Sequence, residues 1–153
     1  MPIKNRLEKY FYEANRHKEH LIEAKLEIKY PIEHYDNLTK LEKFALDTLI
    51  FRFSKLQDLI GAKIFRNYLE YLELPTNEFS FFDILKEIEK EGIIDIDSWS
   101  ELREIRNDIA HDYPQELDEM LEKINLFIEK SDLLLNILQK LEEKYNEIKK
   151  QRD

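Results

Sequence analysis

The amino-acid sequence predicts an all-α protein, an antiparallel bundle of about five helices that forms a single domain over residues 1–153. The chain has 153 residues, which fits one domain with a sizeable core. Charged residues make up 37% of it, and only two glycines and four prolines interrupt a composition rich in Lys, Glu and Leu. This composition is typical of long helices joined by short connections.

The first helix is expected over residues 3–30. Pro31 ends it, because proline cannot continue a helix and disfavours helical geometry in the residue before it. Asp36 and Asn37 then predict a turn that offers caps to the next helix. That second helix is expected over residues 39–74, before the Pro-Thr-Asn break that follows.

The second helix combines a long apolar pattern with one glycine. Its apolar residues recur at helical spacing: Leu41, Phe44, Ala45, Leu49, Leu56, Leu59, Ile60 and Ile64. Gly61 interrupts this pattern, although glycine destabilises a helix interior by about 1 kcal/mol relative to alanine. We therefore expect Gly61 to permit the close approach of another helix.

A short third helix is predicted from a capping signal. Ser80 and Asp83 resemble a capping box, with Asp in place of the usual Glu or Gln, and Gly92 marks the end of the helix. The apolar residues 93–96 are too few to indicate a strand. We interpret them as a connector.

The last two helices meet at Pro114. Asp97 or Ser98 caps the fourth helix, which ends near Pro114, and the fifth helix runs from Pro114 to Lys149, since proline is favourable in a first turn. Apolar residues of the fifth helix alternate at spacings of four and three, with Ser131 as the polar interruption. These positions are Met120, Ile124, Phe127, Ser131, Leu134, Leu138, Leu141, Tyr145 and Ile148. The pattern predicts a core helix of the bundle, with a partner-binding zipper as the alternative.

Composition and charge exclude several classes of protein. The chain has no cysteine, which excludes disulfides and thiolate metal sites, and the histidines (His17, His20, His34) are completed by no ligand pattern, so no metal and no cofactor are expected. No apolar run approaches the roughly 20 residues that span a bilayer, and the N-terminus leads into charged residues. We expect a cytoplasmic protein without a membrane partner. The net charge of −9 is opposite to that of a general nucleic-acid coat protein, so a bound nucleic acid must meet a local basic patch.

The most informative stretch is Arg106-Asn107-Asp108-Ile109-Ala110-His111-Asp112-Tyr113, an Arg-x4-His-x-Tyr run closed by Pro114. Arginine is always charged and binds phosphate oxygens, while histidine exchanges a proton near neutral pH. In helical projection Arg106 lies close to the core face, and His111 is about 140° away around the helix. One copy therefore does not form a compact pair, whereas a symmetric dimer brings two arginines and two histidines around one cleft.

This run resembles the signature of HEPN domains, in particular the HepT-type toxins encoded beside minimal nucleotidyltransferase antitoxins. The similarity continues upstream over residues 99–105, and residues 51–61 are similar to the second helix of this family. The resemblance implies a HEPN-like helical homodimer with a composite site where two protomers meet. It also implies a metal-independent endoribonuclease whose substrate is RNA, with transfer RNA among the candidates.

The residue types predict how such a site works. His111 acts as general base or acid on an RNA 2′-hydroxyl, whose attack on the adjacent phosphorus yields a 2′,3′-cyclic phosphate. Arg106 holds the nonbridging oxygens and stabilises the charge of the transition state. Asn107 and Arg103 are expected to support this pair, and Arg52 and Lys55 to extend the basic patch toward RNA.

The resemblance also implies regulation. In HepT-type toxins the partner nucleotidyltransferase modifies a tyrosine at a position similar to Tyr113 with AMP, so we expect the cognate antitoxin to silence the enzyme in this way. Tyr113 as a packing residue is compatible with this role. The alternative function is a noncatalytic, nucleotide- or substrate-binding partner of a nucleotidyltransferase. A third is a scaffold in which Arg106 bridges to an acidic residue and His111 only interacts with the helix dipole.

Overall fold

The computed structural model describes residues 1–112, 118 and 120–153, and these residues form helices, turns and loops without a strand. The α-helices are α1 (Ile3–Leu26), α2 (Lys40–Leu59), α3 (Phe65–Tyr71), α4 (Phe81–Lys90), α5 (Ile96–Asp112) and α6 (Leu121–Arg152). A π-helical turn, η2 (Ile60–Ile64), joins α2 to α3 without a break, and η1 (Tyr35–Asn37) and η3 (Thr76–Glu78) are short 3-10 turns. In the described part of the chain the helices therefore group into five rods, which confirms the all-α prediction.

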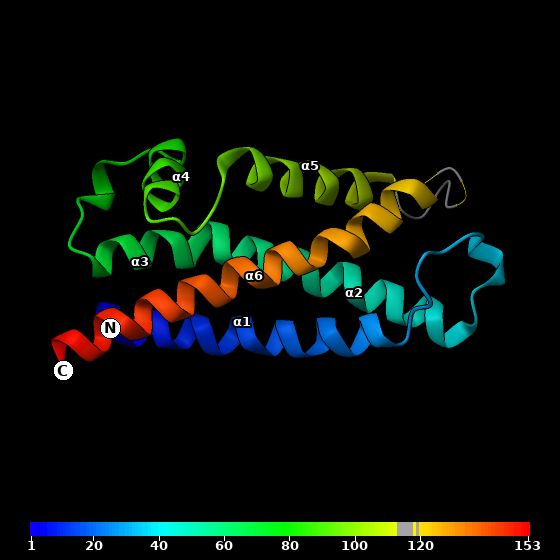
Figure 1. Ribbon diagram of the computed structural model, residues 1–153, viewed down its shortest axis with the longest axis horizontal. Helices are drawn as coiled ribbons and strands as arrows, with labels where there is room; N and C mark the ends of the chain where they lie inside the picture. Colours follow the sequence, from blue (N-terminus) through cyan, green and yellow to red (C-terminus); the bar gives the residue numbers. More distant parts are fainter. Residues whose placement is uncertain (113–117, 119) are drawn as a thin grey trace.

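Four of the rods run up and down along one long axis, and the short α4 stands across it (Figure 1). α1 lies antiparallel to the rod formed by α2, η2 and α3, which makes the most extensive contact in the fold. α5 runs back along the other side of that rod. α6 then crosses the other long helices obliquely, so that the two termini lie at the same end. α5 and α2 are consequently antiparallel neighbours.

α1 ends four residues before the predicted limit, at Leu26. Ile28 and Ile32 follow it in the connection and are both buried. The backbone of Ile32 pairs with one side chain of α6, because its N–H donates to Asn125 Oδ1 at 2.8 Å and its carbonyl accepts from Asn125 Nδ2 at 2.9 Å. Because this tertiary contact holds the connection in a non-helical conformation, the helix ends before Pro31.

α2 is capped by a different residue from the ones expected. Thr39 is its N-cap, and Thr39 Oγ1 accepts from the Glu42 N–H at 3.0 Å while Glu42 Oε1 accepts from the Thr39 N–H at 3.2 Å. Asp36 and Asn37 lie in η1 instead. The prediction of their capping role was wrong, since the reciprocal box at Thr39 satisfies these amides.

The capping box of α4 is confirmed. Ser80 Oγ accepts from the Asp83 N–H at 3.1 Å, and Asp83 Oδ2 accepts from the Ser80 N–H at 3.0 Å. α5 begins at Ile96, slightly before the predicted start. The Ile96 N–H donates to Glu89 Oε2 at 2.9 Å, so a side chain of α4 satisfies the first turn of α5.

α6 spans Leu121–Arg152, so it extends past Lys149, while Pro114, its predicted start, lies outside the described residues. Arg152 Nη1 donates to the Tyr71 carbonyl at 2.7 Å, and its guanidinium lies 4.4 Å from the centre of the Tyr71 ring, which holds the last turn against α3. The core seam is confirmed, because every seam position is buried except Ile148, which is partly buried. Ser131, the polar member, donates its hydroxyl to the Ile128 carbonyl at 2.6 Å.

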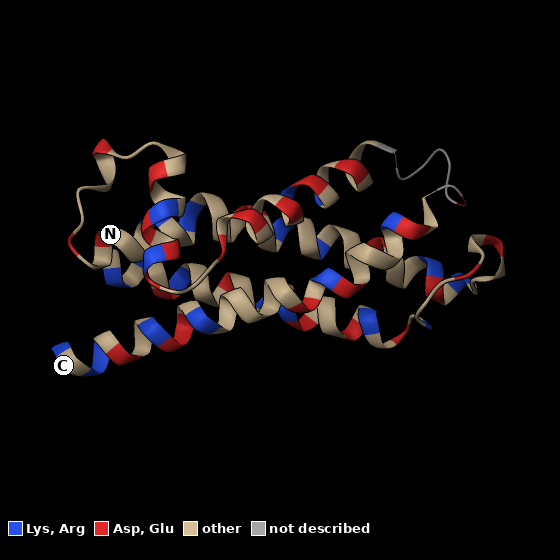
Figure 2. Ribbon diagram, turned by 45° about the horizontal axis from the view of Figure 1, so that its top comes forward, with Lys and Arg blue, Asp and Glu red and all other residues tan. Residues whose placement is uncertain are grey.

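Acidic and basic residues interleave along the outer sides of the helices, most clearly toward the C-terminal end of α6 (Figure 2). The net charge of −9 is therefore spread over the surface in small patches of both signs. In the part of the chain that the structure describes, no helix combines the length and the apolar character needed to cross a bilayer.

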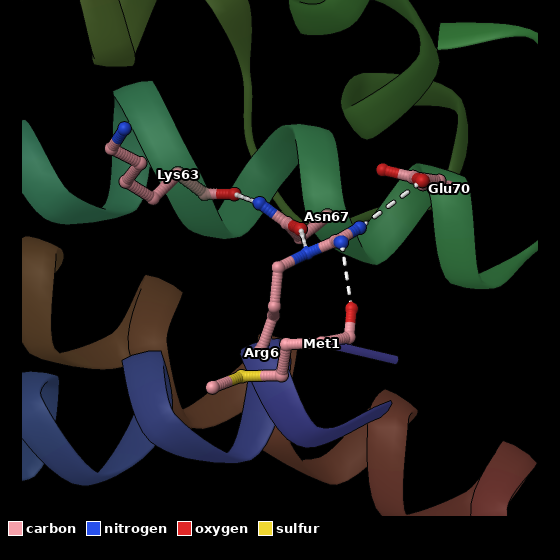
Figure 3. A network of polar contacts seen from close by, with 5 residues as sticks. All are labelled: Met1, Arg6, Lys63, Asn67 and Glu70. Carbon is pink, nitrogen blue, oxygen red and sulfur yellow. Dashed lines mark hydrogen bonds and ion pairs between the residues drawn. The ribbon is translucent and has the colours of Figure 1, made fainter. Parts of the chain in front are cut away.

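A polar network joins the start of α1 to α3 (Figure 3). Arg6 Nε donates to Asn67 Oδ1 at 3.1 Å, and its two terminal nitrogens donate to the Met1 carbonyl at 3.0 Å and to Glu70 Oε1 at 3.2 Å. Asn67 in turn donates to the Lys63 carbonyl at 2.7 Å. Since Lys63 belongs to η2, the network ties α1 to the π-helical turn.

Candidate functional site

A pocket of about 310 Å³ opens between the end of α2, the turn η2 and the middle of α5, and α4 contributes one residue to it. We call it the α2–α5 pocket. Its lining residues are Gln57, Asp58, Gly61, Ala62, Phe81, Trp99, Arg103, Arg106 and Asn107. Three residues of the predicted site (Arg103, Arg106 and Asn107) therefore meet at one cavity.

The wall of the pocket depends on Gly61. A Cβ atom at this position would lie 2.9 Å from Trp99 Cζ2, so only glycine lets the indole lie against the turn. The ring of Phe65 packs on the same indole, with 4.9 Å between the ring centres. The expectation that Gly61 permits close helix packing is confirmed, and a π-helical turn at this point is typical of a functional region.

Arg106 is held at the rim of the pocket by two side chains. Its Nη2 donates to Asp58 Oδ2 at 3.0 Å, and its Nη1 donates to Asn107 Oδ1 at 3.3 Å. Its side chain is 31% exposed, and that of Asp58 is 55% exposed. Arg106 thus has the acidic partner that the scaffold interpretation expected. The pair is open enough to water that a phosphate can compete for the guanidinium, since exposed ion pairs contribute about 0–1 kcal/mol.

Arg103 and Asn107 lie on either side of Arg106 along α5. The guanidinium of Arg103 stacks over the ring of Phe81, 5.3 Å from its centre, and both residues are exposed. This is a cation–π contact between two exposed side chains that both line the pocket. The pocket therefore has two guanidinium groups at its opening.

His111 is exposed in the last turn of α5 and does not line the pocket. It follows Arg106 by five residues, which places it about 7.5 Å further along the helix axis and about 140° around it. Because α5 and α2 are antiparallel, the displacement along the axis leads toward the N-terminal half of α2. Within one chain Arg106 and His111 do not converge. Tyr113 lies outside the described residues.

Arg52 and Lys55 lie on α2 beyond the pocket and share one aromatic ring. Their charged groups lie 5.5 and 5.7 Å from the centre of the Phe51 ring. Arg52 Nη1 also lies 3.2 Å from His17 Nδ1 of α1. Burial, followed by the charge of Arg52, lowers the pKa of His17, and a neutral imidazole can accept the arginine hydrogen bond. Arg52 is thus partly used by a structural contact, while Lys55 is exposed.

Lys55 belongs to a continuous exposed strip of α2, which we call the outer face of α2. Its members recur at spacings of three and four: Leu41, Phe44, Thr48, Phe51, Lys55 and Asp58. Leu41, Phe44 and Phe51 are 60%, 58% and 52% exposed. Leu41 and Phe44 belonged to the apolar pattern of the predicted helix, but they point away from the core. The outer face ends at the rim of the α2–α5 pocket.

Sequence reasoning missed Gln57. It is only 3% exposed and lines the pocket, yet neither atom of its amide group has a hydrogen-bond partner among the described residues. One signal was available in the sequence, because a glutamine between Leu56 and Ile60 stands in the core register of a helix.

Within the described ranges, no three His, Asp or Glu side chains are grouped so as to hold a metal ion. Of the histidines in the first helix, His17 contacts Arg52, and His20 lies 3.6 Å from Glu23 Oε2.

Comparisons of the chain with protein-family models, with curated proteins and with solved structures give no match. The resemblance to HEPN domains therefore remains a likeness of motif and helix order.

Proposed function

We propose that this chain is a HepT-like, metal-independent endoribonuclease that works as a homodimer and is neutralised by a nucleotidyltransferase antitoxin. The observation that carries the proposal is the meeting of Arg103, Arg106 and Asn107 at the opening of the α2–α5 pocket. Two guanidinium groups beside a cavity are suited to a phosphate and the nucleotide attached to it.

A homodimer would complete the catalytic site. Arg106 and His111 diverge within one chain, so the catalytic pair must come from two protomers. The outer face of α2 supports this arrangement, since its apolar part (Leu41, Phe44 and Phe51) is exposed on the same side of α2 that leads to the pocket. A two-fold axis there would bring the second His111 toward the first Arg106.

The chemistry is that of an internal transphosphorylation. His111 removes the proton of the 2′-hydroxyl, the oxygen attacks phosphorus, and the bond to the 5′-oxygen breaks. The second protomer's imidazolium protonates this leaving oxygen, which gives a 2′,3′-cyclic phosphate and a 5′-hydroxyl. Arg106 leaves Asp58 for the nonbridging oxygens, Asn107 orients the imidazole or the ribose, and Arg103 and Lys55 hold neighbouring phosphates.

The test is cleavage of transfer RNA and mixed RNA by the purified protein in EDTA. Cleavage should produce cyclic phosphate ends, spare DNA, peak between roughly pH 6 and 8, and disappear in His111→Ala and Arg106→Ala. His34→Ala and Arg16→Ala are matched controls, because both residues are exposed and lie in other parts of the chain. All variants should be folded and dimeric by native mass spectrometry. Full activity in His111→Ala would reject histidine catalysis, and a purely monomeric protein at micromolar concentration would reject the composite site.

The regulatory part of the proposal concerns Tyr113. The partner nucleotidyltransferase, with ATP and magnesium, is expected to transfer AMP to its hydroxyl and so to place a negative charge beside the arginines. Tyr113→Phe should retain ribonuclease activity and escape inactivation, with AMP seen by intact mass on the wild type alone. A Tyr113→Phe protein that is inactive and unfolded would make this tyrosine a packing residue.

The alternative is a noncatalytic subunit that holds a nucleotide for a nucleotidyltransferase. The acidic balance of the chain and the small volume of the pocket favour this alternative over the binding of long RNA. The two functions separate in one assay, because the alternative predicts nucleotide binding without RNA cleavage.

A further inference from the structure

Buried polar atoms without a partner gather at the α2–α5 pocket. Five such side-chain atoms occur among the described residues, and four of them belong to pocket residues: Gln57 Nε2, Gln57 Oε1, Trp99 Nε1 and Arg106 Nε. The fifth, the Tyr145 hydroxyl, lies at a different cavity between α1 and α6. Gln57 is 3% exposed and Trp99 is 1% exposed, so solvent at the surface does not satisfy these groups.

Such a concentration calls for a physical explanation. More than about 90% of buried polar groups in native proteins have a hydrogen-bond partner, and exceptions carry an unfavourable free energy of burial. Four such exceptions at one wall of the fold point to a ligand that supplies the missing partners. The chain also adopts a π-helical turn and places Gly61 against Trp99 at this wall, which are further departures from regular helix packing.

We propose that the α2–α5 pocket binds a nucleobase and that Gln57 reads its hydrogen-bonding edge. A carboxamide presents one donor and one acceptor side by side, and its natural complement is a planar ring edge with an adjacent acceptor and donor. Nucleobases carry such edges, and glutamine binds them through two parallel hydrogen bonds. Trp99 Nε1 adds a donor to the same wall.

The rest of the pocket suits a flat aromatic ligand joined to a phosphate. Phe81 is 40% exposed at the pocket and provides a flat face, on which Arg103 already stacks in the free protein. Single-stranded nucleic acids are held in this way, with bases stacked on aromatic rings and on guanidinium planes. Arg106 lies at the rim, so a phosphate bound there would have its base within reach of the pocket.

This inference rests on the proposed function and deepens it, because a base held at Gln57 would be the nucleotide next to the bond that is cut. The ribonuclease would then have a base preference built into α2. Binding would also replace a contact of the free protein, since the phosphate would compete with Asp58 for Arg106.

Trp99 makes the test direct, because it is the single tryptophan of the chain and belongs to the pocket. Its fluorescence would be followed while AMP, GMP, CMP, UMP or ribose 5-phosphate is added to the full chain. At least one nucleotide should change the emission and bind more tightly than ribose 5-phosphate. The preference among bases should be about 5- to 150-fold, the range of one paired contact.

Gln57→Leu should reduce all four nucleotides to the affinity of ribose 5-phosphate, and Gln57→Glu should reorder them, because a carboxylate accepts hydrogen bonds and does not donate them. Gln139→Leu is the matched control, since Gln139 is an exposed amide on α6 that donates to Glu143 Oε1 at 2.9 Å. It should bind like the wild type.

Three results would overturn the inference. They are equal binding of ribose 5-phosphate and all nucleotides by the wild type, an unchanged base preference in Gln57→Leu, and emission that no nucleotide alters. The first and third need only the wild type, so a poorly folding variant does not remove the test. RNA cleavage measured on the same preparations separates the two proposals. Base preference without cleavage rejects only the proposed enzyme, and cleavage without base preference rejects only the base-binding pocket.

Discussion

Gln57→Leu is expected to make the free protein more stable. The wild-type side chain is 3% exposed, and both of its amide atoms lack a hydrogen-bond partner among the described residues. Leucine has a similar volume, branched where glutamine is linear, has no polar atom, and would continue the apolar register of Leu56 and Ile60 on the same helix. The substitution therefore removes a desolvation penalty and opens little space.

The size of the gain follows from that penalty. An unsatisfied buried polar group destabilises a protein by about 1–3 kcal/mol, and the imperfect fit of the branched leucine side chain subtracts a fraction of this. We expect the free energy of unfolding to rise by about 1–2 kcal/mol. For a chain of this length each kcal/mol corresponds to about 2–4 °C in Tm, so the thermal midpoint should rise by roughly 2–8 °C.

Urea unfolding followed by circular dichroism measures this difference, with Gln139→Leu as the control that should change stability by less than about 0.5 kcal/mol. The reasoning fails if Gln57→Leu lowers the free energy of unfolding by about 1 kcal/mol or more. Such a loss would show that the amide has good partners in the free protein. A variant that gains stability while it loses base preference is the signature of a residue kept for binding.

Gly61→Ala should lower the free energy of unfolding, measured in urea, by about 1–3 kcal/mol, because the new Cβ would lie 2.9 Å from Trp99 Cζ2. This loss should exceed the gain from the better helix propensity of alanine. Equal or higher stability would contradict the close contact. Asp58→Asn should tighten RNA binding by about two- to fivefold at low salt in a filter or anisotropy assay. The substitution frees Arg106 from an ion pair that contributes at most about 1 kcal/mol. Weaker binding would mean that Asp58 orients the arginine for RNA binding. His17 has a lowered pKa in the native state, so the unfolded chain takes up a proton at a higher pH, and stability should decrease as the pH falls through about 6.5. Urea midpoints between pH 5 and 8 should lose this component in His17→Gln, and the same pH dependence in both proteins would exclude His17 as its source.

Helix features that depend on residues close together in the sequence could be predicted from the sequence. The capping box of Ser80 and Asp83 and the apolar seam of α6 are determined by residues three and four positions apart, and both predictions are confirmed. The end of α1 was misplaced because it depends on the contact of Ile32 with Asn125, which lies 93 positions away. Such a contact leaves no periodic signal.

The same distinction holds for the candidate site: features within one helix were predicted, and contacts between helices were not. Helical projection placed Arg106 near the core face and separated it from His111, and the structure agrees on both points. The arginine's acidic partner, Asp58, is 48 positions away, and its identity required the packing of α5 on α2. Gln57 was overlooked although its core register is visible in the sequence, and its lack of hydrogen-bond partners could be seen only in the packed structure. The prediction for Tyr113 lies outside the described residues and stays a prediction.

The turn η2 has a consequence for how this fold can vary among related chains. A π turn fits one residue more into a helix than the α-helical turns on either side of it, so it is what a one-residue insertion produces when the flanking helices keep their packing. Removing that residue would rotate α3 by about 100° relative to α2. It would carry Asn67 away from Arg6 and would replace Gly61 at the surface of Trp99. Chains aligned with this one should therefore either keep the length of residues 60–64 together with the glycine, or show a one-residue gap there and lack the pocket.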